Sequence, residues 1–228
     1  MRKIYQIALY ALAFVTLAAC DSNSDDDPEP LQASLIQDIA ADPTVGRDPV
    51  TGRPISLNQY AFVSLRDGNI VLTYDNTTRT DSASTNWDIA FQGTNIIFNG
   101  GNSGPGQGGA VILEQTFEEV IEAPADSEFR TDGVSVCSTD MGDGAAFAVC
   151  PGSDNGWYNY NPASNLVSPL AGRTIAVRTA DGRFAKFRIL SYYQGNPAIT
   201  DVTATTPSRF YTIEYVFRAD GSRNLESL

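Results

Sequence analysis

Runs of β-branched and aromatic residues, separated by turn residues, recur along the chain from Tyr60 to its end. An Asp-Gly pair lies between two such runs at residues 67–68 and again at residues 181–182, and a third pair follows the run FYTIEYVFR at residues 220–221. Asp-Gly between β-forming segments is the strongest short-range signal for a β-hairpin. The pattern therefore predicts three hairpins of antiparallel strands.

Shorter apolar runs add strands to these hairpins. They predict strands at residues 87–91, 95–98 and 110–113. In FYTIEYVFR, bulky residues occupy both alternating faces, which is typical of an interior strand that is covered on both sides.

Helical patterns are few. The segment SLIQDIAAD, residues 34–42, predicts one short helix, and Thr116 with Glu119 forms a capping box that predicts a second one, ending before Pro124. No long helical pattern alternates with the strands, so parallel βαβ units are not expected. The predicted fold is mostly β: a single antiparallel all-β domain with one or two short helices.

The N-terminus has the pattern of an export signal. Positive residues precede a short apolar run that closes on Leu-Ala-Ala-Cys at residues 17–20. The run is shorter than the roughly 20 apolar residues that a membrane-spanning helix needs. The ending resembles the lipobox of bacterial lipoproteins, in which cleavage leaves Cys20 to carry lipid; an ordinary signal peptide is the alternative.

These features divide the chain into three parts. Residues 1–19 are the expected lipoprotein signal peptide, and residues 20–33 are an acidic tether whose polar, proline-bearing composition suits a flexible linker. Residues 34–228 are the expected β domain. The lipid predicts an outer-membrane lipoprotein on the periplasmic or the cell-surface face of the envelope.

The charge of the chain argues against nucleic acid as a partner. The formal net charge is −12, and loss of the signal removes Arg2 and Lys3 but no acid, which makes it −14. A chain this acidic repels phosphate backbones.

Two cysteines, Cys137 and Cys150, remain once Cys20 carries lipid. In an oxidising compartment this even pair predicts a disulfide, worth about 3 kcal/mol by the chain-entropy argument. A metal site is the alternative, but two thiols in a chain without any histidine make a weak ligand set.

The absence of histidine also removes several enzyme classes. Neither a Ser-His-Asp site nor a Cys-His site can be built without it. A carboxylate pair for glycoside cleavage stays open, because such pairs form in space and not in sequence. A non-enzymatic protein is the expectation.

The stretch GPGQGG, residues 104–109, has the written form of a dinucleotide-binding loop. Such a loop must open a helix whose N-terminus faces the pyrophosphate. Here the next residues are Ala-Val-Ile-Leu, which favour a strand. We therefore interpret the stretch as a flexible connection between strands, in which glycine supplies backbone freedom and not amide donors.

Several motifs occur in a fixed order along the chain: a Trp-Asp strand at residues 87–88, a Ser-Gly-x-Gly-x-Gly-Gly-Ala turn at residues 103–110 and an Arg-x-Ala-Asp-Gly hairpin at residues 178–182. The segments GWYNY and FYTIEYVFRADGS and the lipobox accompany them. Together they resemble the HmuY family of haem-binding bacterial lipoproteins. The resemblance implies an all-β fold in which two loops clamp haem, and haem delivery to an outer-membrane receptor.

The chain departs from the family in the residues that hold haem iron. The resemblance implies two axial histidines or methionines, but the chain has no histidine, and its one methionine after the signal is Met141. Met141 falls near the place of the first family ligand, and the second falls near Asn161 or Pro162. The haem-binding candidates are therefore Met141, Tyr158 and Tyr160, with Tyr192 and Tyr193 also available as tyrosinate ligands.

Two other hypotheses for the binding site stay open. A flat apolar molecule, haem included, can bind by aromatic packing alone. The chain can also have lost haem and bind another ligand or a protein partner.

Overall fold

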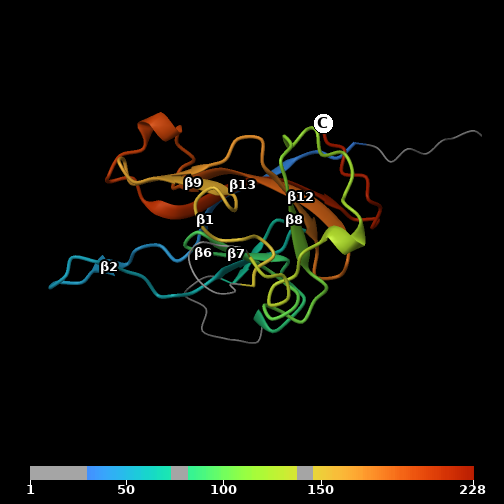
Figure 1. Ribbon diagram of the computed structural model, residues 1–228, viewed down its shortest axis with the longest axis horizontal. Helices are drawn as coiled ribbons and strands as arrows, with labels where there is room; N and C mark the ends of the chain where they lie inside the picture. Colours follow the sequence, from blue (N-terminus) through green and yellow to red (C-terminus); the bar gives the residue numbers. More distant parts are fainter. Residues whose placement is uncertain (1–29, 73–81, 138–145) are drawn as a thin grey trace, which may run out of the picture.

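The computed structural model describes residues 30–72, 82–137 and 146–228, and its main strands form two antiparallel sheets that pack face to face (Figure 1). The larger sheet has the order β1 (Ser34–Ala40), β13 (Ser208–Arg218), β12 (Phe184–Tyr193), β11 (Thr174–Arg178), β8 (Gly109–Leu113). The smaller sheet has the order β5 (Ile70–Leu72), β4 (Ala61–Val63), β6 (Ile89–Gln92), β7 (Asn95–Phe98). The mostly β, antiparallel fold class is confirmed.

Two ribbons and two short 3-10 helices complete the fold. The ribbons are β2 (Gly46–Arg47) with β3 (Pro54–Ile55), and β9 (Tyr158–Asn161) with β10 (Leu166–Pro169). The 3-10 helices are η1 (Asp126–Glu128) and η2 (Ile199–Asp201). The β2–β3 ribbon projects from the body at the left of Figure 1. Within the described ranges no helix has the length and apolarity to cross a bilayer.

Two of the three predicted hairpins are confirmed. Asp67-Gly68 joins β4 to β5, and Asp181-Gly182 joins β11 to β12. Gly68 and Gly182 have φ values of +70° and +85°, which a residue with a Cβ rarely adopts. The third prediction is wrong, because the residues after Asp220-Gly221 do not return along β13. They pair with the segment near residue 122, where Leu225 donates to the carbonyl oxygen of Ile121.

The helix predicted at residues 34–42 is wrong, since Ser34–Ala40 forms strand β1. The spacing of Ile36 and Ile39 suggested a helical face. The structure instead has a register shift between them in the pairing with β13, where Asp38 has a φ of +58°. This bulge adds a residue to the strand, so both isoleucines face the core although they are three residues apart.

The capping box at Thr116 forms, but no helix follows it. The amide of Thr116 donates to a carboxylate oxygen of Glu119 over 2.8 Å, and Glu119 donates back to the Thr116 hydroxyl over 3.4 Å. The chain makes one turn at residues 117–119 and then continues without forming a helix. The carbonyl oxygens of Phe117 and Val120 accept hydrogen bonds from the Lys186 amine, at 2.5 and 2.9 Å, and not from helix amides.

The glycine-rich stretch connects β7 to β8, as expected, but the reason for its glycines was wrong. Gly104, Gly106 and Gly108 do not have left-handed backbone, and each is packed too tightly for a side chain. The Gly106 amide donates to Asn99 Oδ1 over 2.9 Å, and the Gly108 amide donates to the Asn99 carbonyl over 2.7 Å. The stretch therefore packs closely over Asn99, and its backbone amides hold it there through hydrogen bonds.

Gly106 gives a direct test of this packing. A Cβ atom on Gly106 would lie 2.6 Å from the Asn99 carbonyl oxygen and 2.8 Å from Ala180 Cα. We expect Gly106→Ala to lower the free energy of unfolding by about 1–3 kcal/mol in urea denaturation, because backbone must move. Gly46→Ala is the matched control: nothing lies within 4 Å of its Cβ position, so its effect should stay within about 0.5 kcal/mol. Equal effects would contradict the account.

A second apolar layer covers the outer face of the large sheet and encloses Lys186. The side chain of Lys186 is fully buried, and its amine lies 4.3 Å from the centre of the Phe117 ring and 3.1 Å from the Ser227 hydroxyl. Burial lowers the pKa of Lys186 from 10.5 to about 8. Lys186 thus holds the 116–120 turn and the C-terminus against β12.

This burial predicts that stability rises with pH in a window set by Lys186. Below pH 8 the amine is charged in both states, and the folded state bears the full desolvation cost. Between pH 8 and 10.5 the folded amine loses its proton while the unfolded amine keeps it. The unfolded state then binds more protons, so the free energy of unfolding should rise by about 1–3 kcal/mol from roughly pH 7.5 to 9.5.

Urea denaturation at stepped pH measures this rise. Lys186 is the one lysine outside the expected signal peptide, so Lys186→Met should remove the slope whatever it does to the absolute stability. A wild-type stability that is flat or falls across this window would contradict the buried charge.

Candidate functional site

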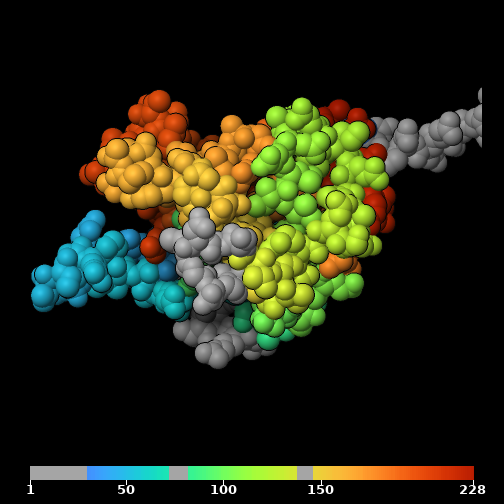
Figure 2. All heavy atoms as spheres, in the orientation of Figure 1, coloured from blue at the N-terminus to red at the C-terminus, as the bar shows by residue number. Residues whose placement is uncertain are grey.

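A cavity with a volume of 660 Å³ lies between the β9–β10 hairpin and the loop of residues 194–207 that joins β12 to β13. Figure 2 shows the gold hairpin and the orange-red loop at the upper left, above the cyan β2–β3 ribbon. The lining comes from both segments, from the end of β12, from the start of β13 and from β3. It consists of Pro54, Tyr160, Ser164, Asn165, Leu166, Val167, Tyr192, Tyr193, Val202, Thr203, Ala204, Thr206, Ser208 and Arg209.

Two tyrosines at the end of β12 form an aromatic wall of this cavity. The ring of Tyr192 lies 5.7 Å from that of Tyr193 and 5.3 Å from that of Tyr211, centre to centre. The Tyr193 hydroxyl accepts a hydrogen bond from the Val167 amide over 3.0 Å, which ties β10 to β12. Burial raises the pKa of Tyr192, so this residue stays a neutral phenol. The wall is largely buried and mainly apolar.

The two tyrosine candidates on β9 are two residues apart and therefore point to the same face of the strand, but they differ in burial. Tyr158 is buried, packs 4.9 Å from the Trp157 ring and is not part of the cavity lining. Tyr160 lines the cavity, is 41% exposed and donates its hydroxyl to Asn165 Oδ1 over 2.9 Å. Asn161 is engaged in the hairpin tip, where its Oδ1 accepts the Ala163 amide over 2.9 Å.

Arg209 lines the cavity and is paired with Asp42. Its guanidinium donates from Nη1 to the Asp42 carbonyl oxygen over 2.9 Å, and the same nitrogen lies 3.5 Å from Asp42 Oδ2. The Asp42 side chain is 5% exposed and that of Arg209 is 31% exposed. Thr203, Thr206 and Ser208, which carry hydroxyl groups, also line the cavity.

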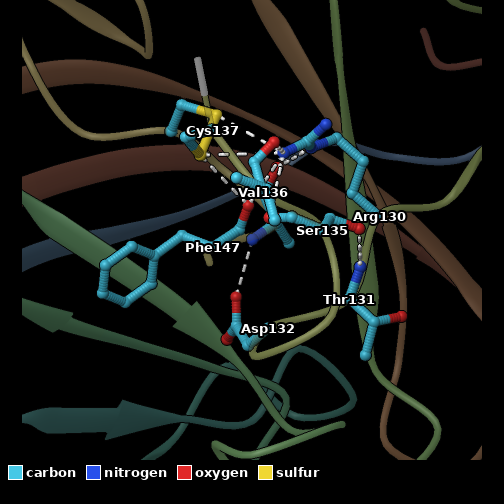
Figure 3. Close-up of a disulfide and its surroundings, with 9 residues drawn as sticks. Arg130, Thr131, Asp132, Ser135, Val136, Cys137 and Phe147 are labelled. Atoms are coloured by element: carbon cyan, nitrogen blue, oxygen red, sulfur yellow. Dashed lines mark hydrogen bonds between the residues drawn. A yellow bond between two sulfur atoms is a disulfide. The ribbon is translucent and has the colours of Figure 1, made fainter. Parts of the chain in front are cut away.

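The predicted disulfide between Cys137 and Cys150 is present, with a Cα–Cα distance of 5.5 Å. Figure 3 shows the Arg130 guanidinium beside it. Nη2 of Arg130 lies 3.6 Å from the sulfur of Cys137 and 3.5 Å from that of Cys150. The guanidinium also donates to four backbone oxygens, those of Ser135, Val136, Phe147 and Ala148. The disulfide and Arg130 therefore fix the two ends of segment 138–145.

Asp132 anchors the same region to the small sheet. Its buried carboxylate accepts the amide of Phe98 over 2.8 Å and that of Ala148 over 2.7 Å. Burial raises the pKa of Asp132. One carboxylate thus joins β7 to the segment before Cys150; Figure 3 shows Asp132 below the disulfide.

The structure brings some of the sequence-predicted residues together and separates others. Tyr160, Tyr192 and Tyr193 share the cavity, Tyr158 lies outside it, and Met141 and Cys20 lie outside the described residues. The sequence reasoning missed Arg209 and Asp42, whose meeting depends on the β1–β13 pairing. Neither residue lies in a motif that would have marked it.

The described residues contain no group of three or more acidic, cysteine or histidine side chains arranged to hold a metal ion.

A family model described as "HmuY protein" matches residues 56–205 of the chain. Among solved structures, the apo HmuY analogue of Tannerella forsythia is 16% identical, with a TM-score of 0.42, and the match covers 85% of this chain and 99% of that one. Apo PinO, whose source is given as Porphyromonas gingivitis, is 17% identical, with a TM-score of 0.43 and coverages of 82% and 97%. No curated protein matches the sequence. The family assignment rests on the sequence model.

Proposed function

The chain belongs to the HmuY family, and we propose that it is a non-enzymatic protein that binds haem or a related tetrapyrrole in the cavity beside the β9–β10 hairpin. The observation that carries the proposal is the combination of this family match with the cavity. Two solved relatives, named as an HmuY analogue and as PinO, are apo forms.

The cavity suits a flat, largely apolar molecule. Its volume of 660 Å³ is within the range of small-molecule sites. Leu166, Val167, Tyr192 and Tyr193 supply an apolar and aromatic surface, and Thr203, Thr206, Ser208 and Arg209 add polar groups to the lining. Such a combination fits a ligand with a large apolar ring system and a few polar groups on its edge.

Tyr160 is the side chain of the described cavity that best fits an iron ligand. Phenolate oxygen is a known haem ligand, as in catalase. Tyr160 is partly exposed, and a side-chain amide is its hydroxyl partner, which an incoming iron can displace. Tyr192 fits less well, because burial raises its pKa and opposes loss of the proton. Met141, outside the described residues, is the proposed second ligand or neighbour.

The proposed carrier is held at the outer membrane by lipid on Cys20, with the acidic residues 20–33 as a tether. From there it would pass its ligand to an outer-membrane receptor. Family membership supports the lipid anchor and the uptake role.

A second function is favoured by one specific observation. The chain has no histidine and one methionine beyond the signal, so neither ligand pair of the family can form in one chain. The alternative is a surface lipoprotein of the same fold that binds another apolar ligand or a protein partner and not haem.

Titration with ferric haem tests the proposal on the mature chain from residue 20, with Cys20→Ser to remove the lipid site. We expect a saturable Soret shift at micromolar haem. Tyr160→Phe should alter the spectrum and weaken binding by at least about tenfold, because the iron loses its oxygen ligand. Tyr158→Phe is the matched control and should change neither, since Tyr158 lies outside the cavity lining.

The possible outcomes separate the parts of the proposal. A wild-type chain without a Soret shift would contradict haem binding and favour the alternative. Normal binding with an unchanged Tyr160→Phe spectrum would contradict only the ligand assignment.

A further inference from the structure

Arg209 is the one charged residue among the described residues that line the cavity. The rest of that lining is apolar, aromatic, hydroxyl-bearing or amide-bearing. The chain as a whole carries a net charge of −12, or −14 without the signal. The net charge repels an anionic ligand on average, and a positive side chain in the cavity opposes that repulsion locally.

The guanidinium of Arg209 is held in place and still has donors to offer. Its contacts with Asp42 use Nη1, and the Tyr192 side chain interacts with the same guanidinium. A guanidinium has five N–H groups in a planar fork, more than these contacts require. Asp42 and Tyr192 thus orient the fork, and donors remain for an oxygen pair in the cavity.

Arg209 and Asp42 also have an unusual backbone conformation. Arg209 has a φ of +67°, and its partner Asp42 has a φ of +59°. Left-handed backbone is uncommon for residues with a Cβ, and it is found preferentially where function demands a fixed geometry. The Ala41 amide donates to the Arg209 carbonyl oxygen over 2.8 Å, so the two unusual residues sit side by side at the end of the β1–β13 pairing.

A carboxylate is the ligand group that this arrangement fits. Planar guanidinium matches a carboxylate through two parallel hydrogen bonds. We propose that Arg209 binds a peripheral carboxylate of the ligand, so that the cavity selects tetrapyrroles with free acid side chains over neutral ones. The inference rests on the proposed function and adds to it the class of ligand and the residue that recognises its carboxylate.

Two ligands that differ only in charge test the inference. Ferric haem and its dimethyl ester share the ring system and the iron, but the ester has no carboxylate. The mature Cys20→Ser chain should bind haem about 10- to 100-fold more tightly than the ester. The Arg209→Gln variant should bind haem more weakly by this same factor, and its affinity for the ester should equal that of the wild type. The comparison on the wild-type chain stands even if the variant fails to fold.

Asp42→Asn separates ligand binding from a structural role of Arg209. If Arg209 binds the ligand, Asp42→Asn keeps the main-chain oxygen that holds Nη1 and removes only the competing carboxylate, so haem affinity should stay the same or rise. If Arg209 only holds Asp42, then Asp42→Asn and Arg209→Gln should weaken both ligands alike, which would overturn the inference. Arg188→Gln is the control: Arg188 pairs with Glu118 and Glu214 away from this cavity and should have no effect.

Failure of the inference and failure of the proposed function give different results. Equal affinity of the wild-type chain for haem and for the ester overturns the role of Arg209 but leaves haem binding intact. A wild-type chain that binds neither molecule overturns both.

Discussion

Tyr211 joins the two sheets to the wall of the cavity. It lies fully buried on β13, with its ring 4.5 Å from that of Phe91 on the small sheet and 5.3 Å from that of Tyr192. Its hydroxyl donates to the Gly93 carbonyl oxygen over 2.8 Å, and Trp157 packs 5.1 Å from the same ring. Because one side chain contacts both sheets and the approach to β9, the position of the β9–β10 hairpin depends on the sandwich core.

The polar parts of the molecule depend on a few buried groups that fix loops between strands. Asp132 and Arg130 hold the residues on both sides of segment 138–145 through backbone hydrogen bonds. Lys186 does the same for the 116–120 turn on the opposite side of the large sheet. Each charged group makes hydrogen bonds to backbone atoms that have no partner in a neighbouring strand. Buried polar atoms need such partners. These loops are thus positioned by single side chains, which a strand pattern does not reveal.

Much of the fold was predictable from local pattern. Alternating β-forming runs and Asp-Gly turns located β4–β5 and β11–β12, and two cysteines beyond the expected export signal predicted the disulfide. What failed depended on tertiary context. The spacing of Ile36 and Ile39 imitated a helix because a bulge at Asp38 changes the strand phase, and the glycines of residues 104–109 serve close packing and not left-handed turns. At the cavity, Tyr160 is one of the tyrosines that the sequence offered as ligand candidates, whereas Arg209 and Asp42 meet only after β1 pairs with β13.

The account centres on the cavity beside the β9–β10 hairpin as the place where the ligand lies. A crystal of the mature chain with ferric haem, measured at the iron absorption edge, locates the iron directly. The account predicts an anomalous peak inside this cavity, within bonding distance of the Tyr160 hydroxyl, with a haem carboxylate beside Arg209. An iron peak elsewhere on the molecule, or haem packed outside this cavity, would contradict it.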